Sequence, residues 1–189
     1  TLWHTLSLHD ALPIWCEAEE GTLLPIVGTP LVFAPPIDWT YAKRDDATLV
    51  SKSDVGAVIV IASHERSRGT AFVKAKARAA LARELLEKAD LETREKLGPL
   101  LPDPRYRDRV GEVKLWKWSE PNTQRADEAN GELLVVAGES GAREVVGVAF
   151  APDDDEEAVG TILDALKTIH TRAEGEGDEA VESSDDGAS

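Results

Sequence analysis

The sequence of 189 residues contains no methionine and only one cysteine, Cys16. A single thiol cannot form an internal disulfide and cannot build a thiolate zinc cluster. No apolar run approaches the roughly 18 residues that a membrane-spanning helix requires, so we predict no transmembrane segment. Because a translated gene begins with methionine, its absence indicates that the native start of the chain is missing.

The first fourteen residues differ in character from the rest of the chain. Residues 5–14, TLSLHDALPI, resemble the translation of a widely used short-read sequencing adapter. We therefore interpret residues 1–14 as an artefactual leader, rather than a genuine amphiphilic segment, and leave them out of the fold prediction. With the native N-terminus masked, both an envelope or secreted location and a cytoplasmic one are compatible with the sequence.

Negative charge is unevenly distributed along the chain. The formal net charge is −15, and residues 173–189 contribute seven acids and no base to it. This last segment is also poor in apolar residues, which predicts a disordered acidic tail. An acidic chain is a poor match for phosphate-rich ligands, so we predict no nucleic-acid partner.

Residues 31–172 have the pattern of a single α+β domain that follows an irregular lead-in at residues 15–30. Apolar runs and turn residues predict strands near residues 31–33, 37–41, 48–51, 57–62, 113–118, 133–137 and 144–150. Near-helical spacing predicts a long helix over residues 70–97 and a second over residues 153–170. The expected fold is a mostly antiparallel sheet packed with a long central helix and a C-terminal helix.

The same patterns predict which side chains face the core. Trp39 is expected in the core. The long helix is expected to bury Phe72, Val73, Ala77, Ala80, Leu81, Leu85, Ala89 and Leu91. The last helix is expected to bury Val159, Ile162, Leu163, Leu166 and Ile169. Asn130-Gly131 predicts a hairpin turn, and Ser140-Gly141 predicts another.

The order of these parts resembles a known superfamily. A short strand leads into APPIDWTYAK and ATLVSKSDVGAVIVIASHE, a long helix follows, and VVGVAFAPDDDEEAVGTILDALKTI closes the domain. Over residues 29–172 this arrangement is similar to Mog1/PsbP/DcrB-like domains, which end with a strand and a helix packed on the sheet. The resemblance implies an accessory or binding role. It assigns no functional residue to this chain, because no functional motif of the family matches position by position.

Two polar motifs are candidates for chemical sites. His64-Glu65 could support acid–base chemistry, but no partner pattern for catalysis accompanies it. The five acids at residues 153–157 could bind calcium, but they lack the alternating ligand pattern with its glycine, and acids favour a helix start in any case. We therefore predict no catalytic residue, no metal ligand and no cofactor.

Two groups of side chains are candidates for contacting a partner. A basic stretch without any acid from residue 66 to residue 83 includes Arg66, Arg68 and Lys74, which could hold an acidic partner or the chain's own tail. Trp116 and Trp118 share one face of a predicted strand, where they are either core or partner anchors. Cys16 could carry a lipid anchor, with an ordinary free thiol as the alternative.

These patterns favour a non-enzymatic accessory or protein-binding domain. One alternative is a cytoplasmic chaperone-like adaptor for a secreted protein. Another is a small enzyme with a site near His64, which a well-formed pocket around that residue would favour.

Overall fold

The computed structural model describes residues 14–52, 56–93, 97–101, 109–110, 113–114, 118–125 and 130–174. Almost all of the expected leader and of the expected acidic tail lie outside these ranges, and so does Trp116. Among the described residues, no helix combines the length and the apolar character that crossing a membrane would require.

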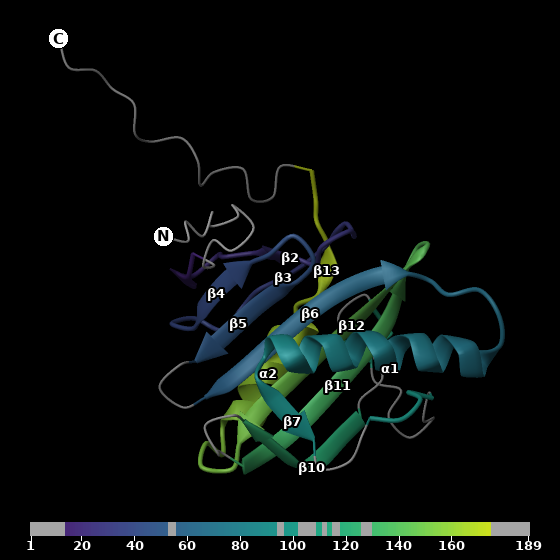
Figure 1. The fold of residues 1–189 in the computed structure, drawn as a ribbon. Coiled ribbons are helices and arrows are strands. Elements are labelled where there is room, and N and C mark those ends of the chain that lie inside the picture. Colours follow the sequence, from purple (N-terminus) through teal and green to yellow (C-terminus); the bar gives the residue numbers. More distant parts are fainter. Residues whose placement is uncertain are drawn as a thin grey trace, which may run out of the picture.

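An antiparallel sheet of eight strands forms the centre of the described structure (Figure 1). Each neighbouring pair runs in opposite directions. In spatial order the strands are β1 (Cys16–Glu17), β4 (Thr40–Lys43), β5 (Thr48–Lys52), β6 (Ala57–Glu65), β12 (Arg143–Pro152), β11 (Asn130–Ser140), β10 (Trp118–Arg125) and β7 (Leu91–Thr93).

Two small sheets accompany the large one. β2 (Leu24–Pro25), β3 (Leu31–Phe33) and β13 (His170–Thr171) form a three-stranded sheet in which β3 is central. β8 (Arg109–Val110) and β9 (Val113–Lys114) form a two-stranded pair. Because β13 pairs with β3, the last described strand is joined to a strand from the beginning of the chain.

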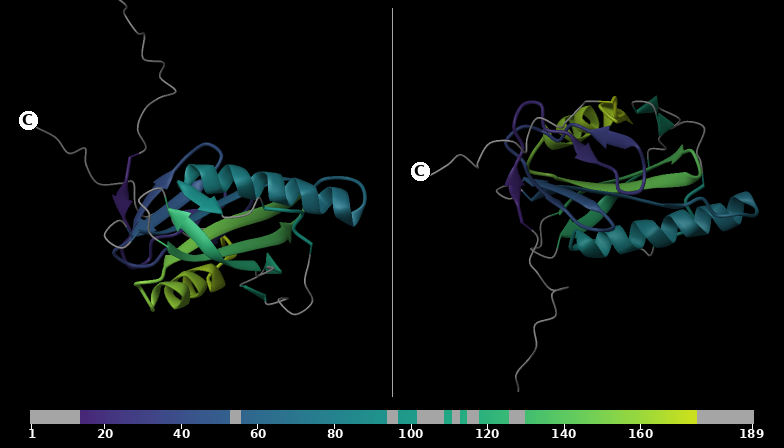
Figure 2. Two further views of the ribbon diagram at one scale, coloured as in Figure 1. Left: turned by 60° about the horizontal axis from the view of Figure 1, so that its bottom comes forward. Right: turned by 90° about the horizontal axis from the view of Figure 1, so that it is seen from above.

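The two helices cover opposite faces of the large sheet (Figure 2). α1 (Ala71–Lys88) packs on the face that carries Val58, Val60 and Val148. α2 (Ala158–Lys167) packs with β2 and β3 on the face that carries Ile59 and Ile61. Since successive residues of a strand point to opposite faces, the fully apolar run at the start of β6 supplies both cores.

The fold is mostly β, so the expected α+β class with a long central helix is wrong. Thirteen strands and two helices, of 18 and 10 residues, make up the described structure. The helix expected over residues 70–97 ends at Lys88. Asp90 then takes a left-handed conformation with φ of 54°, and Leu91 begins strand β7, which pairs with β10. The helix expected over residues 153–170 covers only α2.

The buried face of α1 also differs from the expected one. Phe72 and Val73 are 52% and 45% exposed. The buried residues of α1 are Ala75, Arg78, Ala79, Ala82, Leu85 and Leu86. Small side chains therefore let the helix lie close to the sheet, and Arg78 is buried with them. In α2, by contrast, Ile162 and Leu166 are buried as expected, and so is Ile169 just after the helix.

Of the two predicted hairpin turns, one lies where it is expected. Ser140 pairs with Arg143, so Gly141 and Ala142 form the turn, and Gly141 has the positive φ of 59° that such a turn needs. Gly131, in contrast, lies within β11 opposite Pro152. A Cβ there would come within 2.3 Å of the Ala151 carbonyl oxygen, so this glycine allows close packing.

Candidate functional site

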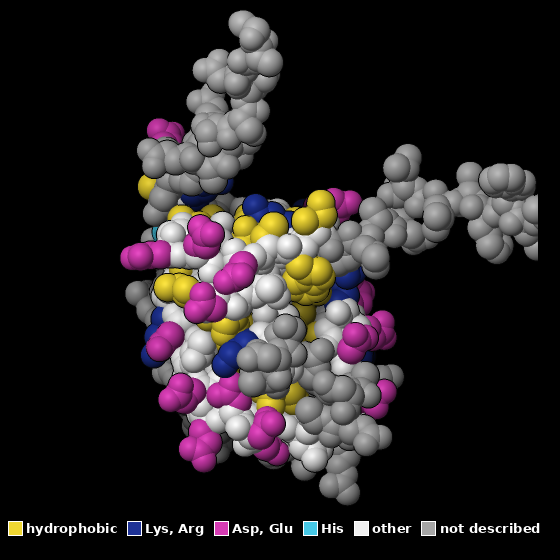
Figure 3. Space-filling model, turned by 90° about the vertical axis from the view of Figure 1, so that its left-hand side faces the viewer, with side chains coloured by type: hydrophobic (Ala, Val, Ile, Leu, Met, Phe, Trp, Pro, Cys, Tyr) yellow, Lys and Arg dark blue, Asp and Glu magenta, His cyan; other side chains and the backbone are white. Residues whose placement is uncertain are grey.

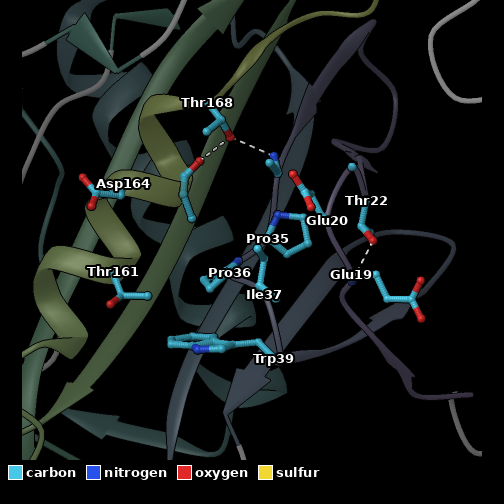
Figure 4. Close-up of a pocket in the computed structure, with 13 residues that line it drawn as sticks. Glu19, Glu20, Thr22, Pro35, Pro36, Ile37, Trp39, Thr161, Asp164 and Thr168 are labelled. Atoms are coloured by element: carbon cyan, nitrogen blue, oxygen red, sulfur yellow. Dashed lines mark hydrogen bonds between the residues drawn. The ribbon is translucent and has the colours of Figure 1, made fainter.

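An open groove lies between α2 and the segments that flank β1 and β3 (Figure 4). Its volume is about 470 Å³. Three separate stretches of the sequence line it. They are Glu19, Glu20, Gly21 and Thr22 from the loop after β1; Ala34, Pro35, Pro36, Ile37 and Trp39 between β3 and β4; and Thr161, Asp164, Ala165 and Thr168 from α2 and its C-cap.

Hydrogen bonds at both ends hold residues 34–39 in place as the floor of the groove. The Ala34 N–H donates to Thr168 Oγ1 at 2.7 Å, which ties the segment to the end of α2. The Ala18 N–H donates to the Trp39 carbonyl at 2.7 Å, and the Asp38 N–H donates to the Ala18 carbonyl at 3.0 Å. Asp38 has a φ of 67°, a conformation that breaks the extended chain there.

This local turn presents one apolar side chain to solvent and buries another. Ile37 is 58% exposed, whereas Trp39 is 4% exposed. The prediction that Trp39 belongs to the core is therefore confirmed, but Ile37 does not share its environment. Pro35 and Pro36 have no backbone N–H to satisfy, so this stretch can face a ligand without leaving donors unpaired.

Carboxylates form the rim of the groove. Glu19, Glu20 and Asp164 are exposed, and no lysine or arginine is among the lining residues that the structure describes. Asp164 has a neighbour in Lys167 at 3.6 Å, but both side chains are mostly exposed and such a pair contributes little. Figure 3 shows carboxylates, with Lys and Arg side chains among them, around hydrophobic side chains on the side of the molecule that carries β4 and β5. The groove can therefore hold apolar groups flanked by positive charge.

A second cluster of polar residues is buried between α1 and the large sheet. Glu144 of β12 is 3% exposed, and Arg78 of α1 is 4% exposed. Glu144 Oε1 lies 2.9 Å from Arg78 Nε and 3.1 Å from His64 Nε2. His64 and Glu144 are directly opposite each other in the β6–β12 register. Arg78 Nη1 also donates to the Leu100 carbonyl at 2.8 Å.

Opposing effects act on the pKa of Glu144. Burial raises this pKa, because a carboxylate loses its hydration, but hydrogen bonds from His64 and Arg78 and their charges lower it by more. The pKa of Glu144 therefore lies below its ordinary value. The charged carboxylate is hydrogen-bonded to His64 and paired with Arg78, so the cluster connects β6, β12, α1 and the segment containing Leu100.

The structure changes the interpretation of His64. Glu65, the next residue, is exposed. The hydrogen-bond partner of His64 is instead Glu144, which is 80 positions away. A base held by a carboxylate would need a nucleophile nearby. The neighbouring Ser63 hydroxyl lies on the other face of the sheet and donates to the Val27 carbonyl. Among the described residues, the cluster therefore offers a structural contact and no nucleophile.

Among the residues predicted to contact a partner, the structure describes the side chains of Arg66, Arg68 and Lys74. Arg66 Nη2 donates to the Gly141 carbonyl at 2.6 Å and lies 3.4 Å from Glu139, so it is tied to the β11–β12 turn. Arg68 is exposed before α1, and Lys74 is half-buried on α1. Trp116 and the side chain of Trp118 lie outside the described residues. The backbone of Trp118 begins β10 opposite Val135.

Two further candidates are described by the structure. Cys16 is exposed in the edge strand β1, where it pairs with Tyr41. Among the acids at residues 153–157, Asp155 lies 3.5 Å from Lys52 and accepts a hydrogen bond from the Glu157 N–H. No group of three or more potential metal ligands lies together among the described residues.

Sequence reasoning missed the groove and two members of the buried cluster. Glu144 has a signal, because it alternates with Val146 and Val148 on one face of a strand and thus falls on a buried face. Arg78 has a weaker one, since it stands among alanines that allow close packing. The groove has no local signal, because its three walls come from separate parts of the chain.

No protein-family model matches the chain, and no curated protein matches it. Among solved structures, the chain is similar to a protein from Bacteroides thetaiotaomicron VPI-5482 with a TM-score of 0.49 and 14% sequence identity. The similarity covers 84% of this chain and 51% of the other, so the chain spans about half the length of that protein. Similarity at this level carries no argument about function, which has to come from the residues of the structure.

Proposed function

We propose that the protein is a non-enzymatic binding domain, and that its groove takes a peptide segment of a protein partner that combines apolar and basic side chains. The observation that carries the proposal is the pairing of an apolar floor, with Ile37 exposed, and a rim made only of carboxylates among its described charged residues. The resemblance of residues 29–172 to Mog1/PsbP/DcrB-like domains implies the same class of role.

The two parts of the groove contribute differently to recognition. Ile37, which is exposed, and Pro36, which is half-buried, offer an apolar surface, and burial of apolar area favours association. Glu19, Glu20 and Asp164 attract positive charge, which selects the partner and accelerates the encounter. Because the floor is fixed by hydrogen bonds to Thr168 and Ala18, little ordering is needed on binding.

The test is selection from a displayed library of random short peptides on the full chain. We expect enriched peptides to carry Lys or Arg beside apolar residues. Their dissociation constants, measured by fluorescence anisotropy, should rise about tenfold in Glu20→Lys/Asp164→Lys, since exposed charges contribute up to about 1 kcal/mol each and 1.4 kcal/mol is tenfold. Ile37→Ser should cost on the order of 1 kcal/mol of binding free energy.

A matched control is available on the opposite face of the sheet. Glu84 and Glu87 are exposed on α1, so Glu84→Lys/Glu87→Lys makes the same change in net charge away from the groove. The control should bind the selected peptides within about twofold of the parent chain, because screening weakens distant charges. Equal losses of peptide affinity in both variants would show that net charge alone causes the effect. That result would overturn the assignment of the groove.

A further inference from the structure

The first turns of α1 project past the edge of the large sheet and carry an unusual surface (Figure 1; Figure 2). Phe72 and Val73 are 52% and 45% exposed there. The Lys76 ammonium lies 4.8 Å from the centre of the Phe72 ring. We call Arg68, Phe72, Val73, Lys74 and Lys76 the α1 patch. It combines apolar side chains with positive charge.

No described acid neutralises the positive charge of the α1 patch. The stretch from residue 66 to residue 83 has no acid. Its other bases are engaged. Arg66 lies beside Glu139, Arg78 beside Glu144, and Arg83 donates to the Leu97 carbonyl at 2.8 Å. Arg68, Lys74 and Lys76 form no ion pair with any described residue, although the whole chain carries a net charge of −15.

The chain itself contains a segment of complementary charge. Residues 174–189 hold seven acids and no base, together with Val181 as an apolar residue. Fifteen of these residues lie beyond the described structure, and at about 3.3 Å per residue they can extend roughly 50 Å. A domain of this size has a radius of gyration near 15 Å, which for a sphere corresponds to a width of about 39 Å. The extended length of the segment therefore exceeds the width of the domain.

We propose that residues 174–189 dock on the α1 patch of the same chain and form an intramolecular, salt-sensitive cover. A tethered segment is present at an effective concentration in the millimolar range, so weak contacts are sufficient to hold it. An anionic membrane surface is a poorer occupant, because it would repel the rest of this acidic chain. Any acidic ligand for this face of α1 would have to displace the cover.

The test places a nitroxide spin label in the acidic segment of the full chain, at Ser184→Cys in a Cys16→Ser background. Paramagnetic broadening of amide signals then reports which surface the label visits. We expect the strongest loss of signal at residues 68–76 in low salt. In about 0.5 M NaCl the broadening should disappear, because the screening length falls below about 5 Å.

Matched charge reversals separate the α1 patch from general electrostatics. Lys74→Glu/Lys76→Glu should abolish the broadening at α1. Lys43→Glu/Arg44→Glu, which changes two exposed bases at the end of β4, should leave it unchanged. Acids near the start of a helix are favourable, and α1 has none in its first turn, so the α1 variant is expected to fold.

Three results would overturn the proposal. One is broadening that is spread evenly over the molecule. Another is a loss of the broadening at residues 68–76 that is equally large in both charge-reversal variants. The third is broadening at α1 that survives when the seven acids of the segment are changed to Gln or Asn. Because this test does not use a ligand of the groove, its failure leaves the proposed binding function standing.

Discussion

Glu144 is the side chain through which α1, β6 and β12 share one charged contact. It is buried beside Arg78 at 2.9 Å. Removing one partner of a buried ion pair leaves an uncompensated charge and costs about 3–5 kcal/mol. We therefore expect Glu144→Ala to lower the free energy of unfolding, measured by urea denaturation, by about that amount. Replacing both partners, in Glu144→Leu/Arg78→Met, should recover most of the loss.

The control for this prediction lies on the same hairpin. Glu139 is directly opposite Glu144 in the β11–β12 register, but its side chain is 52% exposed in its pair with Arg66. An exposed pair contributes about 0.2–1 kcal/mol, so Glu139→Gln should have a small effect. Similar losses in Glu139→Gln and Glu144→Ala would mean that burial of the cluster does not govern stability.

The lowered pKa of Glu144 also predicts a dependence of stability on pH. The unfolded chain has a glutamate pKa of about 4.3, and the folded value lies lower. The carboxylate therefore contributes its full stabilisation above about pH 4.3 and loses it as the pH falls through the folded pKa. The stability difference between the parent chain and Glu144→Gln, from urea unfolding, should have its full value near pH 5 and shrink below about pH 4.

A stability difference that stays constant from about pH 5 down to about pH 3 would contradict this assignment. Every other acid is common to both chains, so their titration cancels in the comparison. The sign of the effect is therefore specific to Glu144 and its bonds from His64 and Arg78.

Single residues also show where sequence reasoning succeeds and where it fails. Trp39 is predictable as a core residue because a large aromatic side chain in an apolar segment is rarely left exposed. Arg78 is instead expected on a solvated face, since a base is usually found there. Its burial depends on Glu144, which is 66 positions away, and no local pattern encodes a partner at that distance.

At the scale of elements, two glycines of the structure have opposite environments. Gly131 lies in β11, where a Cβ would meet the Ala151 carbonyl oxygen at 2.3 Å and the Phe150 ring at 2.6 Å. Gly160 lies in α2 with nothing within 4 Å of such a Cβ. Gly131→Ala should thus be destabilising, by about 1–3 kcal/mol. Gly160→Ala should stabilise the protein by up to about 1 kcal/mol, because alanine favours a helix.

Thermal unfolding of these two variants checks the paired glycine prediction. Opposite shifts in Tm are expected, and shifts of the same sign would show that the packing around β11 yields to a methyl group. Both variants add the same methyl group, so the difference between their Tm shifts reports how much space surrounds each glycine.

The helices and strands are predictable to different degrees. The buried strand at residues 57–62 is recognisable because a continuous apolar run has few alternatives. The buried face of α1 is not, since Ala75, Ala79 and Ala82 define it, and alanine carries little hydrophobic signal. The expected helix also continues through Leu91, because that residue fits a helical stripe as well as it fits the edge strand β7.

At the scale of the whole molecule, long-range pairing creates the candidate groove. β13 pairs with β3, and the Thr168 side chain accepts a hydrogen bond from the Ala34 N–H across 134 positions. These contacts bring the end of α2 beside residues 34–39. The sequence indicates the separate segments, including the end of a strand before Pro35 and Pro36. Their assembly into a groove depends on tertiary contacts that no local stretch of sequence contains.

The net charge of −15 leads to a prediction about the whole chain. Like charges repel in the compact state, and the screening length falls from about 30 Å at 0.01 M salt to about 8 Å at 0.15 M. Tm should therefore rise with NaCl over this range, by about 2–4 °C if screening recovers about 1 kcal/mol. Differential scanning calorimetry measures this shift directly.

The acidic segment provides the comparison for this salt effect. Changing the seven acids of residues 174–189 to Gln or Asn takes the net charge from −15 to −8, so the rise in Tm should be smaller in that variant. A Tm that falls as salt is added would mean that attractions between opposite charges outweigh net repulsion. In that case pairs such as Lys88 with Asp46, whose Nζ and Oδ2 lie 2.8 Å apart, would contribute more than their exposure indicates.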